Sequence, residues 1–298
     1  MSKIEAIPIT AQIAKSFLPK RKADSHKGSY GKLALICGSD SFPGAAVLAV
    51  QAALRSGVGY TTLYASSTVR SIVLTSCPEC ICYPIEILYD ASSMLEPLKE
   101  VDAIVFGPGV GQSEQTEALL WKLLFSPLSC PILMDADGIN LMAKSQDKCK
   151  ELFTSKTKNL IFTPHPLEFS RLFGVELNDL LKNRAAHALL AADASSAVVL
   201  LKGHHTLVAS PSSLLWKNTT GSSALAKAGS GDVLAGLIGG FLAQGITPSH
   251  AAALGAYLQG EAGDTLEAEL SPYGVTPSDL PLAIAKRICA LYSEQEKG

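Results

Sequence analysis

The sequence predicts an α/β protein in which helices cover both faces of a mostly parallel sheet. Apolar, β-rich runs alternate with helical patterns along most of its 298 residues, as in sheets that are buried on both faces. Glycine-rich or polar clusters directly follow five of these runs. No linker, repeat or low-complexity tract divides the sequence. We therefore expect residues 1–25 to form a helical or loose lead-in and residues 26–298 to form a single domain.

The expected elements follow this alternation in order. Seven apolar runs are candidate parallel strands, at residues 32–37, 60–65, 80–86, 103–107, 131–135, 160–163 and 197–202. Helical patterns lie between them at residues 44–56, 114–125, 138–143, 168–173 and 180–194. Residues 206–210 and 214–217 then form a hairpin around the turn residues 211–213. Three long helices close the chain, at residues 232–244, 248–269 and 279–294.

The composition argues against several classes of protein. A formal net charge of −2 gives no basic footprint for nucleic acid or an anionic membrane. No apolar run reaches the roughly 18–20 residues of a membrane span, and the first ten residues lack the apolar core of a signal peptide. Seven cysteines form no even set, so we expect free thiols in a cytoplasmic protein. Cys77 and Cys80 have a zinc-ligand spacing, but no second pair completes a tetrahedral site.

The most informative segment is Gly229-Ser230-Gly231-Asp232, which directly precedes an apolar helical run. Glycines before a helix leave backbone N–H groups exposed where the helix dipole also favours negative charge, which makes a seat for a phosphate. A carboxylate there fits a general base that takes a proton from a hydroxyl about to attack the phosphate. The segment taken alone fits equally well a glycine-rich turn with Asp232 as helix N-cap.

Two further clusters carry charged groups at strand ends. Lys202, followed by Gly203, could bring an ammonium to a phosphate, or could be a solvated lysine. Asp135 and Asp137 could hold magnesium through water beside phosphate oxygens. One of these two aspartates could instead cap the next helix.

The remaining clusters hold glycines and histidines. Gly109, in Gly107-Pro108-Gly109, could allow the backbone to approach a ligand closely. A glycine at this position is explained equally well by a tight turn before the next helix. His165 lies between two prolines, and it fits either a contact to substrate or a structural loop. His204 and His205 would face opposite ways on a strand, which argues against a shared metal ion. The sequence has no serine-hydrolase elbow, no Walker lysine motif and no dinucleotide-binding glycine fingerprint after the first strand.

The ordered set of motifs resembles one known family. The glycine-aspartate segment resembles the anion hole and base of the ribokinase-like superfamily, and the whole set is similar to the NAD(P)H-hydrate dehydratase family over about residues 26–294. The matching segments are residues 26–32, 38–46, 55–59, 107–111, 135–140, 163–166, 202–203 and 229–232. We expect the stand-alone form, because no epimerase domain precedes the match.

This resemblance implies a three-layer α/β/α fold and a lyase. The enzyme would dehydrate the S-epimer of hydrated NADH or NADPH, using ADP to phosphorylate the ring hydroxyl and releasing AMP and phosphate. Mg²⁺ would be required, and the protein would be a homo-oligomer, possibly a tetramer. The matching positions assign Asp232 as catalytic base. Substrate-binding positions are Ala45, Gly109, His165, Glu168 and Asp232. Nucleotide-binding positions are Lys202, Gly203, His204, His205, Thr206, Gly229, Ser230 and Gly231.

Departures from the family pattern leave alternatives open. Leu167 stands where bacterial relatives usually have glycine, and residues 168–171 are more like the ATP-using form. We favour ADP over ATP, because His165-Pro166 keeps the bacterial pattern. A ribokinase-like kinase of a vitamin-precursor alcohol would use the same glycine-aspartate segment. A non-catalytic nucleotide sensor is the third alternative.

Overall fold

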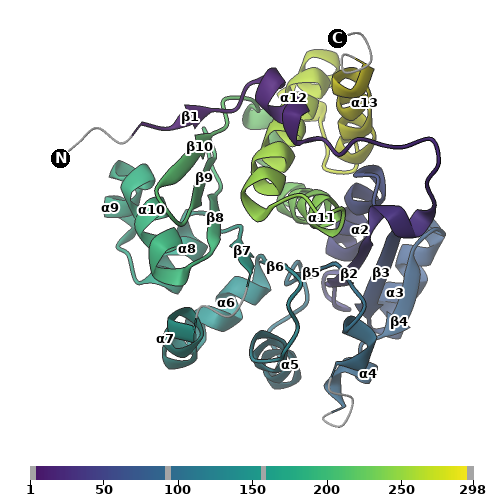
Figure 1. Cartoon of the computed structure of the whole chain (residues 1–298), viewed down its shortest axis with the longest axis vertical. Coiled ribbons are helices and arrows are strands. Elements are labelled where there is room, and N and C mark those ends of the chain that lie inside the picture. Colours follow the sequence, from purple (N-terminus) through teal and green to yellow (C-terminus); the bar gives the residue numbers. More distant parts are fainter. Residues whose placement is uncertain (1–4, 91–94, 156–158, 294–298) are drawn as a thin grey trace.

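The computed structural model describes residues 5–90, 95–155 and 159–293. Within them, ten strands form one sheet in the order β1-β10-β9-β8-β7-β6-β5-β2-β3-β4 (Figure 1). All neighbouring strands are parallel except the β8–β9 and β9–β10 pairs. The strands are β1 (Ile7–Pro8), β2 (Lys32–Ile36), β3 (Tyr60–Ala65), β4 (Ile81–Pro84), β5 (Ala103–Phe106), β6 (Ile132–Met134), β7 (Leu160–Phe162), β8 (Val198–Leu201), β9 (Leu207–Ser210) and β10 (Leu214–Lys217).

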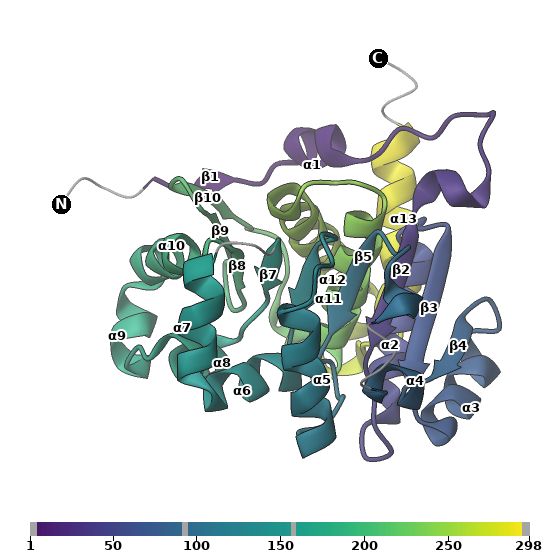
Figure 2. The same cartoon turned by 60° about the horizontal axis from the view of Figure 1, so that its bottom comes forward.

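Helices cover both faces of this sheet (Figures 1 and 2). One face carries α2 (Pro43–Arg55), α3 (Ser67–Ser76), α11 (Ser230–Ala243), α12 (Pro248–Gly274) and α13 (Leu280–Ser293), with α1 (Ala11–Phe17) packed on α12. The other face carries α4 (Glu86–Tyr89), α5 (Glu114–Leu124), α6 (Asp137–Lys144), α7 (Gln146–Ser155), α8 (Pro166–Phe173), α9 (Leu177–Lys182) and α10 (Arg184–Ser195). Short 3₁₀ turns occur at η1 (Lys27–Tyr30), η3 (Glu96–Leu98) and η4 (Ser223–Leu225).

Side chains that alternate along each strand pack into two separate hydrophobic cores, one on each face of the sheet. In β2, Leu33 and Leu35 pack into the core under α2 and α11, whereas Ala34 and Ile36 pack into the core on the opposite face. All four residues are fully buried. Side chains of a strand alternate between faces, so a strand that is apolar throughout must be covered twice. The predicted three layers are therefore confirmed.

The predicted strands are found within one or two residues of their expected ends. The helices α3, α4 and α7 were missed, as was the short β1, which pairs with β10 and so places the lead-in at the edge of the sheet. The prediction of a single helix at residues 180–194 is wrong. The structure has two helices there, α9 and α10, because Asn183 between them has the non-helical angles φ −126° and ψ 37°. Helix α12 continues past the expected end at 269 through a kink at Ser271, where φ is 63°. The last residue of the closing predicted helix lies outside the described residues.

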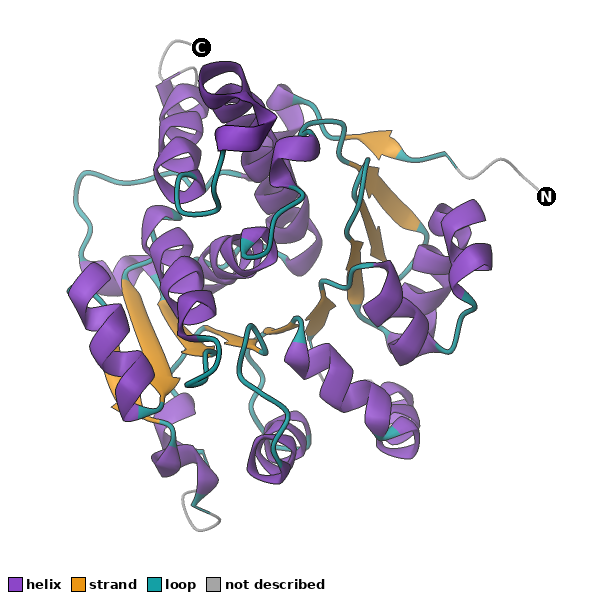
Figure 3. Cartoon of the chain, turned by 180° about the vertical axis from the view of Figure 1, so that it is seen from behind, coloured by secondary structure: helices purple, strands orange, loops and turns teal. Residues whose placement is uncertain are grey.

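Close packing fixes helix α11 against helix α2. A Cβ at Gly236 would lie 2.0 Å from the carbonyl oxygen of Ala49, so only glycine allows the two helices to approach this closely. Figure 3 shows the two helices side by side from behind the molecule. This contact holds the N-terminal end of α11 at the carboxyl edge of the sheet. Among the described helices, none has the length and apolar character to span a membrane.

Candidate functional site

A cavity of about 700 Å³ lies between the ends of strands β6 to β8 and the N-terminus of α11. Open α/β sheets bind their ligands at this carboxyl edge. Eleven residues singled out from the sequence line it: Asp135, His165, Lys202, Gly203, His204, His205, Thr206, Gly229, Ser230, Gly231 and Asp232. Ala45, Gly109, Asp137 and Glu168 lie outside its lining.

Asp232 occupies the first turn of α11. The N-cap of this helix is Gly229, whose φ of 104° favours glycine, so the alternative of an N-capping Asp232 is wrong. Among the described residues, the Asp232 carboxylate accepts no hydrogen bond. Burial, followed by the negative charge of Asp135, raises the pKa of Asp232 to about 7. A carboxylate with this pKa can accept a proton near neutral pH.

Lys202 lies opposite this carboxylate in a polar cluster. Its Nζ is 2.8 Å from Asp135 Oδ1, which also accepts a 2.8 Å hydrogen bond from the hydroxyl of Thr163. Glu168 Oε2 lies 3.8 Å from the same ammonium. Burial opposes the charge on Lys202, but the carboxylates of Asp135 and Glu168 raise its pKa overall. The alternative of a fully solvated lysine is wrong, since this ammonium is partly buried and paired with carboxylates.

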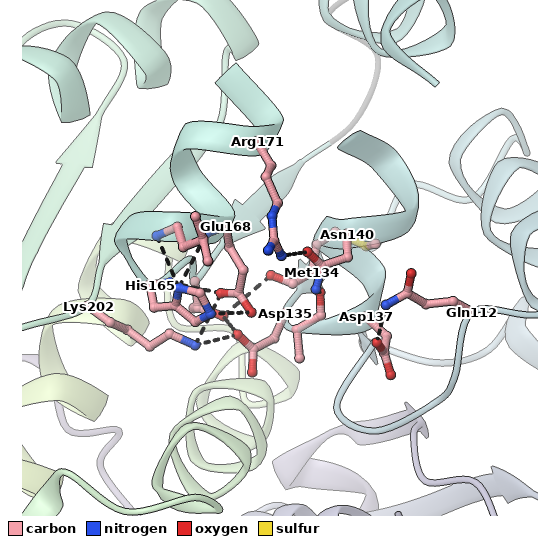
Figure 4. Close-up of polar contacts among 12 residues, drawn as sticks. Gln112, Met134, Asp135, Asp137, Asn140, His165, Glu168, Arg171 and Lys202 are labelled. Atoms are coloured by element: carbon pink, nitrogen blue, oxygen red, sulfur yellow. Dashed lines mark hydrogen bonds and ion pairs between the residues drawn. The ribbon is translucent and has the colours of Figure 1, made fainter. Parts of the chain in front are cut away.

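His165 and Glu168 form a reciprocal cap at the start of α8. His165 Nδ1 accepts the backbone N–H groups of Leu167 and Glu168, and Glu168 Oε2 accepts the N–H of His165 at 2.8 Å. The imidazole Nε2 lies 3.3 Å from Glu168 Oε1 (Figure 4). Burial, and then the charge of Lys202, lower the pKa of His165. This cap agrees with the alternative in which His165 is a structural residue of the loop. The imidazole also lines the cavity, where it could contact a substrate.

The two aspartates after β6 have different surroundings. Asp137 begins α6 and accepts hydrogen bonds from the N–H of Gly111 at 3.0 Å and the Gln112 amide at 2.8 Å. The expected capping role is therefore not found, because Ala136 is the N-cap of α6. Asp135 lines the cavity, and its Oδ2 would be 3.8 Å from a Cβ at Gly231. Within the described ranges, no group of three or more His, Cys, Asp or Glu side chains could hold a metal ion.

The loop after β8 is held from the side by Arg184, which sequence analysis missed. Its guanidinium donates to the carbonyl oxygens of His204 at 2.6 Å, Leu201 at 3.2 Å and Lys202 at 3.3 Å. The expectation that His204 and His205 face opposite ways is wrong, because their ring centroids are 3.9 Å apart. Both residues lie beyond the end of β8, where strand alternation no longer applies.

The remaining predicted residues lie beside the cavity. A Cβ at Gly109 would be 2.8 Å from the Ala45 Cβ, which places the two predicted substrate contacts side by side. The neighbouring Gly107 approaches the backbone of Asp135, since a Cβ there would be 1.9 Å from that carbonyl oxygen. The buried Gln259, also missed, donates to the Ser230 carbonyl at 2.6 Å and supports the first turn of α11.

Comparisons with known proteins agree with this fold. A family model described as NAD(P)H-hydrate dehydratase matches residues 33–286. The ADP-dependent (S)-NAD(P)H-hydrate dehydratase of Bacillus subtilis is 35% identical, over 91% of this chain and 94% of its own length. A crystal structure of the ADP/ATP-dependent NAD(P)H-hydrate dehydratase from Bacillus subtilis, co-crystallised with ATP and Mg²⁺, superposes with a TM-score of 0.87 at 33% identity, covering 97% of this chain and 100% of that one. The expected ribokinase-like fold is thus confirmed.

Some relatives are longer. The bifunctional NAD(P)H-hydrate repair enzyme of Moorella thermoacetica is 36% identical over 91% of this chain, which spans 52% of that enzyme. The chain therefore covers about half the length of the bifunctional relatives that it matches.

Proposed function

The chain belongs to the NAD(P)H-hydrate dehydratase family, and on that premise we propose that it is a lyase that dehydrates the S-epimer of hydrated NADH or NADPH. ADP is the proposed phosphoryl donor, and the products are NADH or NADPH, AMP and phosphate. One observation carries the proposal: Asp232 lies at the N-terminal end of α11 with its pKa raised to about 7.

In the proposed reaction, Asp232 takes the proton of the hydroxyl on the hydrated ring. The hydroxyl oxygen then attacks the terminal phosphorus of ADP, and the bond from that phosphorus to the bridging oxygen of AMP breaks. The phosphorylated ring next loses phosphate with the electrons of its C–O bond. The departing phosphate takes a proton from the adjacent ring carbon, and the electrons of that C–H bond restore the double bond.

The first turn of α11 and Lys202 supply positive potential for this transfer. Backbone N–H groups of residues 229–231 lie at a helix N-terminus, where they can stabilise charge that develops on the transferred phosphoryl group. Lys202 would contact the same group as a point charge, since a Cβ at Gly231 would be 3.4 Å from its Nζ. The loop that Arg184 holds, residues 202–206, is the proposed contact to the rest of the nucleotide.

Magnesium fits this site when it is held through water. The carboxylate of Asp135 is the proposed protein contact, because its Oδ2 faces the first turn of α11 whereas both oxygens of Asp137 already accept hydrogen bonds. Bound magnesium would neutralise charge on the phosphate oxygens. A cytoplasmic location and a homo-oligomeric state belong to the same proposal, and the free cysteines agree with the former.

The proposal is tested by the recovery of NADH absorbance from its hydrate, with ADP and ATP compared side by side. We expect recovery that depends on ADP and releases AMP. Asp232→Asn should lose about 10²–10⁴-fold in kcat with nucleotide affinity nearly unchanged, because a general base acts in the transition state. A stable phosphorylated alcohol would instead indicate the kinase alternative. Full retention of turnover in Asp232→Asn would exclude Asp232 as the base.

A further inference from the structure

A second hollow of about 420 Å³ lies on the surface near the first cavity. It is lined by Gln112, Asn140, Ala143, Lys144 and Arg171. These residues come from the loop after β5, from α6 and from α8. Figure 4 shows Arg171 reaching Asn140, with Asp135 and His165 to one side of this contact and Gln112 to the other.

This hollow carries positive charge without an acidic partner. Lys144 and Arg171 are both exposed, and neither forms an ion pair with any described residue. Its lining contains no carboxylate. Other cations of this chain, such as Lys202 and Arg287, do pair with carboxylates. A pair of unmatched cations in a hollow favours an anionic ligand.

Arg171 is held in a fixed orientation towards this hollow. Its Nη1 donates to Asn140 Oδ1 at 3.0 Å, and the Asn140 amide donates in turn to the carbonyl of Ala136 at 3.2 Å. Among the described residues, the rest of the guanidinium has no hydrogen-bond partner. A planar guanidinium with one edge fixed presents its other N–H groups in the geometry that suits phosphate oxygens.

The hollow is coupled to the first cavity. Ala136, which anchors Asn140, also lines that cavity. The positive charge of Arg171 contributes to lowering the pKa of His165 and partly offsets the raised pKa of Glu168, so its field reaches both groups. A ligand that extends from one cavity to the other would place an anionic group near Arg171.

We propose that this hollow, with Arg171 and Lys144, binds a phosphate group of the dinucleotide substrate while its hydrated ring lies near Asp232. This inference rests on the proposed function, since a dinucleotide carries phosphates at a distance from its reacting ring. The phosphate has two possible sources. The pyrophosphate occurs in both NADH and NADPH forms, whereas the ribose 2′-phosphate occurs only in the NADPH form.

The test uses the full-length protein and two available probes, NADH and NADPH. Their dissociation constants are measured by nucleotide fluorescence for the unaltered protein, Arg171→Met, Lys144→Gln and the control Lys286→Gln, an exposed lysine on α13 outside both cavities. Loss of one charge-assisted contact should weaken binding by about tenfold. Weakening of both probes identifies the pyrophosphate as the ligand, and weakening of NADPH alone identifies the 2′-phosphate.

Two outcomes would overturn the inference. Unchanged dissociation constants for both probes in Arg171→Met and Lys144→Gln would do so, as would an equal weakening in Lys286→Gln. Thermal unfolding of each variant checks that the fold is kept. Binding of NADH and NADPH does not require turnover. If the unaltered protein fails to restore NADH from its hydrate, that failure refutes only the proposed reaction, and the dissociation constants still test the phosphate site. Where turnover is present, the same variants should raise KM for the hydrate about tenfold and leave KM for ADP unchanged.

Discussion

Lys202 and Asp135 join the ends of two strands across a separation of 67 residues, with 2.8 Å between Nζ and Oδ1. The pair faces the first turn of α11, so both charges act on Asp232 in opposite directions. Asp135 raises the pKa of Asp232, and Lys202 lowers it. The pKa of the proposed base therefore depends on the charges of these neighbours as well as on its own burial.

The first prediction concerns the pH dependence of turnover. Because Asp232 must be deprotonated to act as a base, kcat/KM should rise with pH through about 7 and then level off. Asp135→Asn removes a negative charge beside Asp232, so the pKa of Asp232 should fall. The rise in kcat/KM should then move to lower pH by about half a unit to one unit.

A matched variant makes this prediction more specific. Asp137→Asn also removes a charge that raises the pKa of Asp232, but its contribution is the smaller one. We therefore expect a shift in the same direction and of smaller size. The kcat/KM of each variant is divided by that of the unaltered protein at the same pH. Titration of the substrates affects both values equally and therefore cancels. A shift of the Asp135→Asn profile to higher pH would contradict the assignment.

The second prediction concerns stability. The pKa of Asp232 is raised from 3.8 to about 7, so between these values the unfolded chain releases a proton that the folded protein retains. Stability therefore falls as pH rises through this window. Asp232→Asn, which cannot ionise, should be more stable than the unaltered protein by about 1–3 kcal/mol above pH 7 and by little near pH 4. Denaturant unfolding at both pH values measures the difference. Asp24→Asn, an exposed position, should show no such gain.

The third prediction compares glycines at the two ends of α11. Gly229 and Gly245 both have positive φ, at 104° and 84°, but only at Gly229 would a Cβ be crowded, 2.7 Å from Leu48 Cδ1. Gly245→Ala should cost about 1 kcal/mol from backbone strain and leave kcat unchanged. Gly229→Ala should cost at least as much and lower kcat by about tenfold or more, since it displaces the N–H groups of the phosphate seat. Equal kcat values in the two variants would argue against that seat.

Much of the sheet could be predicted because its strands are apolar throughout. Strand β3, at Tyr60–Ala65, has the bounds that the pattern predicts. Helix α3 was missed because Ser67–Ser76 is rich in serine, threonine and valine, which favour a helix weakly. Its helical form depends on the Ser66 cap and on the burial of Val69 and Val73, and packing of this kind is not visible in a local pattern.

The candidate site was predictable as a set of residue types at one sheet edge, but its pairings were not. The rule for parallel sheets brings Asp135, His165 and Lys202 together without indicating which groups touch. Their contacts depend on strand register and on helix positions set elsewhere, as in the case of Arg184. No motif marks Arg184, since its role is to donate to backbone carbonyls, which every residue has.

The short strand β1 has a consequence for handling the protein. Ile7 pairs with Trp216 of β10, and the N–H of Ile9 donates to the carbonyl of Lys217 at 2.9 Å, so β1 covers the outer edge of the hairpin. Removing residues before Gln12 would uncover the backbone donors and acceptors of β10. An uncovered edge is a template for strand pairing between molecules. A protein shortened at this end is therefore expected to aggregate before it loses catalytic activity.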